Sequence, residues 1–418
     1  MNRYDRLSFG FGLCVLASMI GFAPAGAAVT VERVDTTIPG ALQPQRPQEA
    51  TGHEEHAVQE ADVAQEGHAD HGEVVTRSGP VAAPELPAVS DMVRFVDHPE
   101  ESVLELVFGP VSLPEGGPHL RTRVQLVELP IAGWLHGFTW DMRDGQGNVL
   151  PSDLLHHVNF IDPDSRELFS PIARRVIAAG RETQEQRMPK LLGYPFAEGT
   201  RFLISAMFAN PTPEDHLETY LHVRLEYSDG GLIDPRNVYP FYLDVLGPVG
   251  AKEFPLPPGE KTVTWEGSPV VDGRILGIGG HLHDYGKAIA LEDVTEGDVV
   301  WETEPELDEN GRVVAVPSGK LWWKGGIKIY RDHVYRITVT YDNPLDEPAP
   351  DGGMGVIGGV VWADPADWPA LEKTDVAYAQ DLVNTLEAPM KARSHDSMSM
   401  GGDPDGEKPR QSQEPSNH

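Results

Sequence analysis

Two histidines one residue apart, His281 and His283 in the run GGHLHDYGK, are the residues of this chain best suited to binding a metal. The flanking runs RILGI and AIAL have the composition of β-strands. In an extended strand, residues i and i+2 point to the same face, so both imidazoles can reach one ion. Glycines around the pair leave room for solvent or substrate. The alternative is that both histidines are hydrogen-bonded core or exposed strand residues.

A methionine set among glycines, Met354 in GGMGVIGG, lies downstream on another strand-like run. A thioether is a soft ligand that favours Cu(I), and imidazole also suits copper. Two histidines and one methionine leave coordination positions open for dioxygen. Together His281, His283 and Met354 therefore predict a catalytic copper ion, whereas Met354 alone would be interpreted as a core residue.

A second pair of histidines, His156 and His157 in LLHHVNF, lies upstream. Adjacent residues of a regular strand point to opposite faces, so these two rings would not meet. A β-bulge or a strand end could turn one of them toward the other. By itself this pair is a weak indication of a metal site.

The order of these motifs resembles the copper type II, ascorbate-dependent monooxygenases, which include the peptidylglycine-hydroxylating and dopamine-hydroxylating enzymes. HHVNF is followed by an apolar run that ends in Asn-Pro (Phe202 to Pro211), then by the HxH pair, then by the Met-Gly strand. The resemblance spans roughly Arg121 to Trp362. It implies two jelly-roll β-sandwiches in tandem, each with one copper ion, that face each other across a solvent-filled cleft.

The resemblance also implies roles for the candidate ligands. His281, His283 and Met354 match the ligands of the copper that binds dioxygen. His156 and His157 match two of the three histidines of the copper that passes on an electron. Ascorbate or a similar small reductant would supply the electrons as co-substrate.

The first copper site departs from the family pattern. Met207 stands where the resemblance places a third histidine. Either Met207 is itself a ligand, or His222 or His136 supplies the missing imidazole, or the site is degenerate. Met207 is equally consistent with an ordinary strand core.

The positions that hold the substrate in the peptide-amidating members also differ. That family uses an arginine two residues before the HxH pair and polar residues just after the methionine. Here these positions are Gly279, Val356 and Gly358, and none can pair with a carboxylate. A peptide with a C-terminal glycine is therefore not expected as substrate, and the substrate stays unknown.

The N-terminus has the pattern of an export signal. Arg3 and Arg6 precede an apolar stretch from about Leu7 to Phe22, and small residues at 25–27 offer a cleavage site. Residues 1–27 are therefore predicted to be a signal peptide, and the mature protein to be periplasmic or secreted. Cys14, the chain's one cysteine, lies in this stretch, so the mature protein has no disulfide and no thiolate ligand. No integral membrane segment is expected after removal of the signal.

The charge is strongly acidic, with a formal net charge of -32 from 65 acidic and 33 basic residues. This balance argues against partners such as nucleic acid or an anionic membrane, and for cation attraction. No GxSxG, phosphate-loop, CxxC or HExxH motif is present, which removes the common hydrolase, nucleotide and zinc-protease interpretations.

Both ends of the mature chain look disordered. Residues 28–90 form a Pro-, Ala- and Glu-rich linker, and residues 391–418 form a polar tail. The simpler interpretation is that both tails are solvated. The alternative is that their histidines and methionines bind copper weakly; these residues are His53, His56, His68, His71, His395, Met398 and Met400.

Between the tails the chain is predicted to be all-β, with short strands separated by turn signals. Residues 91–248 are assigned to a first jelly-roll-like β-sandwich and 249–368 to a second. Ser165 to Gly180 is predicted to be helical, and residues 369–390, which follow the second sandwich, are predicted to form a helix.

Three functions are compatible with these features. The first is a copper monooxygenase that inserts one oxygen atom into a C–H bond. The second is a non-catalytic copper-binding or copper-buffering protein on the same scaffold. The third is a paired β-sandwich adhesion module without metal.

Overall fold

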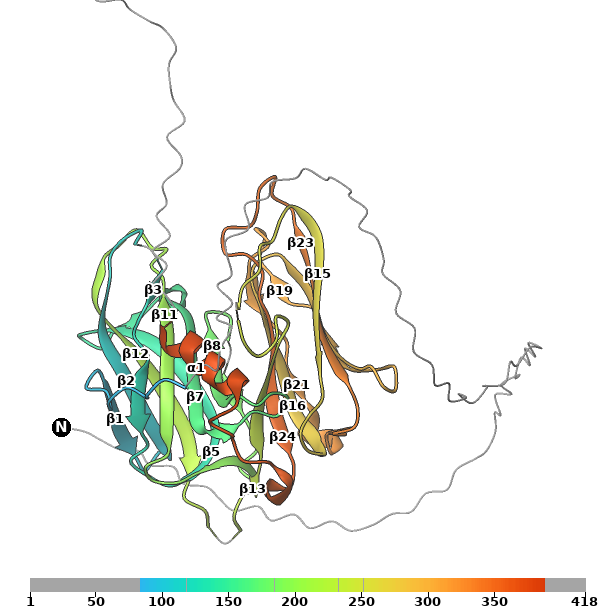
Figure 1. Ribbon diagram of the computed structural model, residues 1–418. Coiled ribbons are helices and arrows are strands. Elements are labelled where there is room, and N and C mark those ends of the chain that lie inside the picture. Colours follow the sequence, from blue (N-terminus) through green and yellow to red (C-terminus); the bar gives the residue numbers. More distant parts are fainter. Residues whose placement is uncertain (1–82, 118, 184, 232, 251, 388–418) are drawn as a thin grey trace, which may run out of the picture. The chain divides into compact units, whose positions relative to one another are not determined.

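The computed structural model describes residues 83–387, apart from residues 118, 184, 232 and 251 (Figure 1). The predicted signal peptide, the C-terminal tail and most of the acidic linker lie outside these residues, as do the histidines and methionines of both tails. The strands of the first sandwich are β1 Val93–His98, β2 Val103–Leu113, β3 Leu120–Arg121, β4 Gln125–Glu128, β5 Gly133–Asp144, β6 Val149–Leu150, β7 Leu155–Arg166, β8 Ala173–Gly180, β9 Gln186–Arg187, β10 Leu192–Phe196, β11 Arg201–Phe208, β12 His216–Ser228 and β13 Arg236–Asn237.

The second sandwich contains the remaining strands. These are β14 Tyr239–Asp244, β15 Gly259–Gly267, β16 Gly273–Leu282, β17 Gly286–Asp293, β18 Asp298–Thr303, β19 Glu306–Leu307, β20 Val313–Ala315, β21 Gly319–Lys320, β22 Ile327–Ile329, β23 Tyr335–Asn343 and β24 Gly355–Trp362. Three short 3-10 helices, at Ser152–Leu154, Leu321–Lys324 and Pro365–Asp367, and one α-helix, α1 Val376–Glu387, complete the described elements.

Each sandwich has two main sheets, so the predicted all-β fold of two jelly-roll-like sandwiches is confirmed. In the first, one sheet has the order β1-β2-β12-β5-β10-β13, and the other has the order β3-β11-β7-β8. In the second, the orders are β14-β24-β16-β21 and β15-β23-β17-β18. Almost all pairs are antiparallel, and only β10 and β13 run parallel among the described strands.

Alternating burial shows how the sequence specifies these strands. In β23 every second residue is buried, from Tyr335 through Ile337, Val339 and Tyr341 to Asn343. This period of two places one face of a strand against the facing sheet and the other outward. Because Tyr341 is one of the inward-facing residues of β23, its hydroxyl points into the sandwich.

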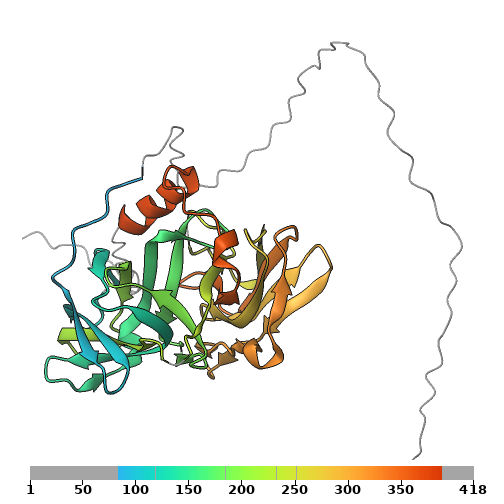
Figure 2. The same ribbon diagram turned by 90° about the horizontal axis from the view of Figure 1, so that it is seen from below.

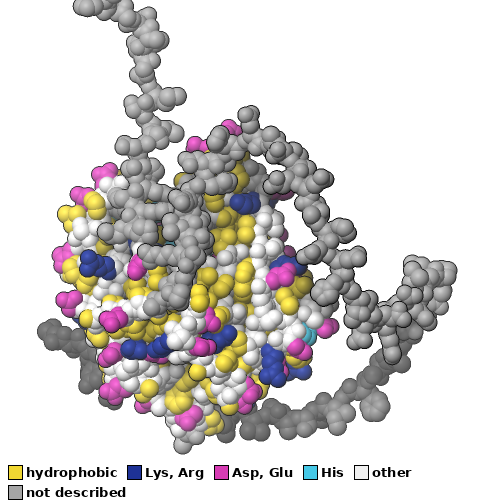
Figure 3. Space-filling model, in the orientation of Figure 1, with side chains coloured by type: hydrophobic (Ala, Val, Ile, Leu, Met, Phe, Trp, Pro, Cys, Tyr) yellow, Lys and Arg dark blue, Asp and Glu magenta, His cyan; other side chains and the backbone are white. Residues whose placement is uncertain are grey.

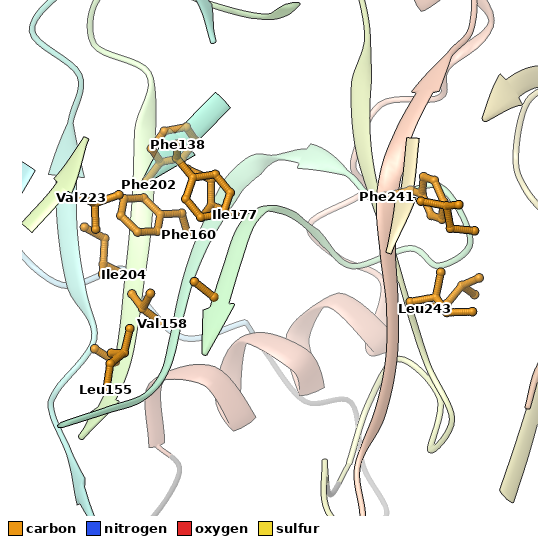
Figure 4. Close-up of a cluster of buried hydrophobic side chains, with 14 of the residues drawn as sticks. Phe138, Leu155, Val158, Phe160, Ile177, Phe202, Ile204, Val223, Phe241 and Leu243 are labelled. Carbon is orange, nitrogen blue, oxygen red and sulfur yellow. The ribbon is translucent and has the colours of Figure 1, made fainter. Parts of the chain in front are cut away.

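The buried apolar side chains form a core that includes residues of both sandwiches. Figure 4 shows Phe160, Phe202 and Val223 packed inside the first sandwich, and Phe241 and Leu243 on β14. On the face drawn in Figure 3, basic side chains lie singly among acidic and apolar ones.

The helix predicted for Ser165 to Gly180 is wrong. Residues 173–180 form strand β8, which pairs antiparallel with β7 from Arg166–Ala173 to His157–Gly180. Pairing with a buried neighbouring strand overrides the helix propensity of a run such as Val-Ile-Ala-Ala. The loop before β8 packs on the second sandwich, where the Phe169 ring lies 6.0 Å from that of Phe241.

The boundary between the sandwiches lies earlier than the predicted position at residue 248. Strand β14 pairs with β24 along its whole length, from Tyr239–Val361 to Asp244–Val356. It therefore belongs to the second sandwich. A single buried residue, Val238, separates it from β13 of the first.

The C-terminal helix is shorter than the predicted segment 369–390 and returns to the first sandwich (Figure 2). It begins at Val376 because the Asp375 side chain accepts a hydrogen bond from the Ala377 backbone N–H, which caps the first turn. Its buried Leu382 packs in a cluster with Leu126 and Ile161. Residues 388–390 lie outside the described part.

Candidate metal centre

A β-bulge brings the adjacent histidines of β7 together. On the paired strand β11, Leu155 lies opposite Phe208 and His157 lies opposite Met207, so His156 is one residue too many in β7. Such a bulge breaks the alternation of side chains. The ring centroids of His156 and His157 lie only 4.1 Å apart, which is the distortion that this pair needs in order to act together.

The HxH pair lies at the end of β16, where the alternation is kept. His281 is within the strand and His283 follows its last residue, Leu282. Their ring centroids are 5.4 Å apart, at an interplanar angle of 87°. The two rings therefore lie side by side, and their binding of one ion stays a prediction.

The two histidine pairs form one cluster, which we call the histidine centre: His156, His157, His281 and His283. Ring centroids lie 4.8 Å apart for His157 and His281, and 5.7 Å apart for His157 and His283. Ring nitrogens of His156, His157 and His283 lie within 4.8 Å of one another. The structure therefore brings the residues of both predicted sites into one cluster, and the number of copper ions stays a prediction.

Three ring nitrogens of the histidine centre are buried without a hydrogen-bond partner among the described residues. They are the Nε2 atoms of His157, His281 and His283. Buried polar atoms in folded proteins are nearly always paired, so three orphans within one cluster require an explanation. A metal ion at this cluster would supply one, since imidazole is a suitable ligand for copper, zinc and other transition metals.

The opposite ring nitrogens fix the tautomers that such binding needs. His281 Nδ1 lies 2.7 Å from the Glu182 carboxylate, and His283 Nδ1 lies 3.0 Å from the Asp351 carbonyl oxygen. A carbonyl or an ionised carboxylate only accepts, so Nδ1 carries the proton in both rings. Each neutral Nε2 then has a free lone pair, as in metal-ligating histidines whose second nitrogen is hydrogen-bonded.

Burial keeps His156, His157 and His283 neutral. Together with neighbouring imidazoles, it lowers the pKa of His156 to about 3 and that of His283 to about 4. Burial likewise holds the pKa of His157 well below its usual range. The imidazoles therefore need not lose a proton at neutral pH before they bind a cation.

Glu182 belongs to the first sandwich, in the turn after β8, yet it holds a histidine of the second. Burial by itself would raise the pKa of Glu182, but the interaction and hydrogen bond with His281 lower it to about 2. Gly180 makes room for this carboxylate, since a Cβ at that position would lie 2.7 Å from Glu182 Oε2. Next to Glu182, Arg181 forms an ion pair at 2.5 Å with Asp284.

Met354 is tied to the HxH strand through its backbone. The Tyr341 hydroxyl accepts hydrogen bonds from the backbone N–H groups of His283, at 3.0 Å, and Met354, at 3.2 Å. It also donates to the Met354 carbonyl oxygen. Tyr341 thus fixes the backbone of the third predicted ligand next to that of the second, and Met354 as a ligand stays a prediction.

The contacts of His136 and His222 show whether either could supply the missing imidazole of the first copper site. His136 uses both ring nitrogens, at 2.6 Å from the Leu192 carbonyl oxygen and 2.7 Å from Ser228 Oγ, so it is not a free ligand. His222 Nδ1 bonds to Glu105. Neither histidine joins the histidine centre.

Two residues of the site could not be foreseen from the sequence. Glu182 reaches His281 over a separation of 99 residues, which no local pattern marks. His119 lies in the loop GGPHL before β3, and its ring centroid is 4.6 Å from that of His156. As a single histidine among glycine and proline, it carries no ligand spacing.

Gly279, Val356 and Gly358 stand where the peptide-amidating enzymes hold their substrate. Gly279 lies on β16, which carries His281, and the other two lie on β24, which follows Met354. Val356 is opposite His281, and Gly358 is opposite Gly279. Asp284, in the turn after the HxH pair, accepts hydrogen bonds from the Arg181 side chain and from the Val313 backbone N–H.

Within the described residues, no helix has the length and apolar character needed to cross a bilayer.

Comparisons with known proteins identify no relative by sequence: no family model matches, and no curated protein matches. Among solved structures, the chain is similar to the major capsid protein P2 from bacteriophage PM2, with 13% identity and a TM-score of 0.29 over 62% of this chain and 99% of that one. It is similar to PNGF-II with 8% identity and a TM-score of 0.27, over 68% of this chain and 63% of that one. Likenesses of this strength carry no argument about function.

Proposed function

We propose that this protein is an exported copper monooxygenase whose metal is held by the histidine centre. The observation that supports it best is the set of three buried, unpartnered Nε2 atoms on His157, His281 and His283. The neutral imidazoles and the tautomers set by Glu182 and Asp351 agree with metal binding. The motif order that resembles the copper type II monooxygenases supports oxygen chemistry.

The proposed reaction converts R–H, dioxygen, two electrons and two protons into R–OH and water. Copper, when bound, would supply one-electron chemistry and a position for dioxygen activation. The chain's own residues hold the ligands. Glu182 and the Asp351 carbonyl orient two imidazoles, Tyr341 fixes the backbone on which His283 and Met354 lie, and burial keeps bulk water away from the ring nitrogens.

The test is reductant-dependent oxygen consumption by the copper-loaded full chain, with ascorbate as electron donor. We expect His281→Ala to abolish it and His333→Ala to leave it unchanged. His333 is the matched control, because its Nδ1 bonds to Asp293, outside the histidine centre. Consumption that survives in His281→Ala would overturn the assignment, provided that both variants keep wild-type circular dichroism.

Burial of the ligand nitrogens also favours the second candidate, a copper-binding protein without turnover. Such a protein gains from shielding an ion, whereas an oxygenase needs an open coordination position. Tight Cu(I) binding by the wild type without reductant-dependent oxygen consumption would favour this function. Oxygen consumption coupled to formation of a hydroxylated product would exclude it.

A further inference from the structure

We infer that His119 is a copper ligand and supplies the third imidazole of the first-sandwich half of the site. This inference rests on the proposed copper-binding function and deepens it. It replaces Met207, His136 and His222, the three residues that the sequence offers for that position.

The first argument is position. His119 immediately precedes β3, whose residues Leu120 and Arg121 pair with Phe208 and Met207 at the end of β11. The same end of β11 pairs with the bulged start of β7. Strand pairing thus brings His119 to the edge of the sheet where His156 leaves the regular alternation.

The second argument is contact. The ring centroids of His119 and His156 lie 4.6 Å apart, with an interplanar angle of 32°. His119 is half-buried and forms no hydrogen bond in the described part of the chain. Its imidazole therefore extends the row of close rings from His157 and His156 by one member, and its two nitrogens have no hydrogen-bond partner among the described residues.

The third argument is the cost of the arrangement without a cation. The buried Nε2 atoms of His157, His281 and His283, next to which His156 and His119 pack, forfeit hydrogen bonds to water when no cation is bound. An ion that binds several of these nitrogens removes that cost. The His119 ring lies next to that of His156, whereas both nitrogens of His136 and Nδ1 of His222 are hydrogen-bonded away from the histidine centre.

Met207 is the competing ligand. It lies directly opposite His157, so its side chain shares that face of the sheet. A thioether bound to copper would stabilise Cu(I) more than an imidazole in the same position would. The two ligands can therefore be distinguished by the atom bound to copper as well as by affinity.

The experiment measures Cu(I) affinity by competition with a coloured chelator, copper stoichiometry after dialysis, and sulfur or nitrogen ligation by X-ray absorption. It uses the full chain as wild type, His119→Ala, Met207→Leu, His157→Ala and His222→Ala. Any copper bound by histidines in the tails is the same in all five proteins, so it cancels when the affinity and stoichiometry of a variant are compared with those of the wild type. Unfolding of the metal-free proteins shows whether each variant is folded.

We expect His119→Ala to weaken Cu(I) binding by at least about tenfold, in line with losses seen when metal-site residues are removed. Met207→Leu and His222→Ala should bind as the wild type does, and Met207→Leu should show unchanged sulfur scattering. Equal affinity of His119→Ala and wild type would overturn the inference. So would loss of affinity and of a sulfur signal in Met207→Leu.

The outcome for the proposed function is separate. If His157→Ala loses copper while His119→Ala does not, copper binding stands and His119 is excluded. If neither the wild type nor His157→Ala shows copper beyond a shared background, the copper function itself fails, and the inference fails with it.

Discussion

The Glu182 carboxylate accepts a hydrogen bond from His281 Nδ1 at 2.7 Å, and the two residues belong to different sandwiches. A ligand on one sandwich is thus oriented by a carboxylate on the other. The tautomer that leaves Nε2 of His281 unprotonated depends on the contact between the sandwiches, so metal binding and the docking of the two halves are linked.

Replacing Glu182 with Gln should weaken Cu(I) binding by about 10–100-fold, the usual effect of losing a hydrogen-bonded partner of a ligand histidine. The amide oxygen keeps one acceptor but no charge, so Glu182→Ala should be weaker still. Arg181→Ala is the matched control, because it breaks the neighbouring ion pair with Asp284 and leaves the His281 bond in place. Chelator competition measures all three; equal losses in Glu182→Gln and Arg181→Ala would contradict a specific effect on His281.

Replacing Tyr341 with Phe should loosen the backbone around His283 and Met354. The buried N–H groups that the hydroxyl satisfies would lose their acceptor, at about 1–3 kcal/mol of stability. We also expect weaker copper binding. Tyr335→Phe provides the comparison, since its hydroxyl accepts from the Tyr330 backbone N–H away from the histidine centre. Urea unfolding should show a loss in both, and only Tyr341→Phe should change copper affinity.

Replacing Asp381 with Ala should detach α1 from the first sandwich. Its carboxylate pairs with the buried Arg175 through bonds of 2.8 and 2.5 Å, and removal would leave that guanidinium unpaired. Loss of one member of a buried pair costs about 3–5 kcal/mol. Asp342→Ala, which breaks an exposed pair with Lys287, should cost about 0–1 kcal/mol. A loss below that of Asp342→Ala would show that the helix is held by its apolar face instead.

Stability should fall as the pH drops below neutrality, in part through His136. Burial lowers the pKa of His136 in the folded protein, although its bond to Leu192 opposes the shift. Below the unfolded pKa of about 6.5, the unfolded chain takes up a proton that the folded chain does not, so the free energy of unfolding decreases. His136→Gln should lose less stability than the wild type between pH 7 and pH 5.5, measured by urea unfolding. An equal loss in both proteins would exclude this histidine as a cause.

Much of the fold could be predicted because strands carry their own signal. Period-two burial in β23 and the same-face placement of His281 and His283 follow from the geometry of an extended chain. The prediction of a helix at 165–180 is wrong because its apolar run is compatible with either structure, and pairing with β7 selects the strand.

The site was harder to predict, because its geometry depends on contacts distant in sequence. The bulge at His156 arises from the register of β7 on β11, and the joining of the two histidine pairs arises from the docking of the sandwiches. Glu182 and His119 are brought to the centre by these long-range contacts, and nothing in their neighbours along the chain marks them.

The path of the chain constrains the order in which this protein can mature. β14 leaves the first sandwich after one residue, and α1 returns from beyond the second sandwich to cover Leu126 and Ile161. During synthesis, which proceeds from the N-terminus, this apolar surface stays uncovered until α1 has left the ribosome. Assembly of the first sandwich is therefore finished only after the second has been synthesised. A chain truncated before residue 376 would expose this apolar surface to chaperones and proteases and would not form an independently stable first domain.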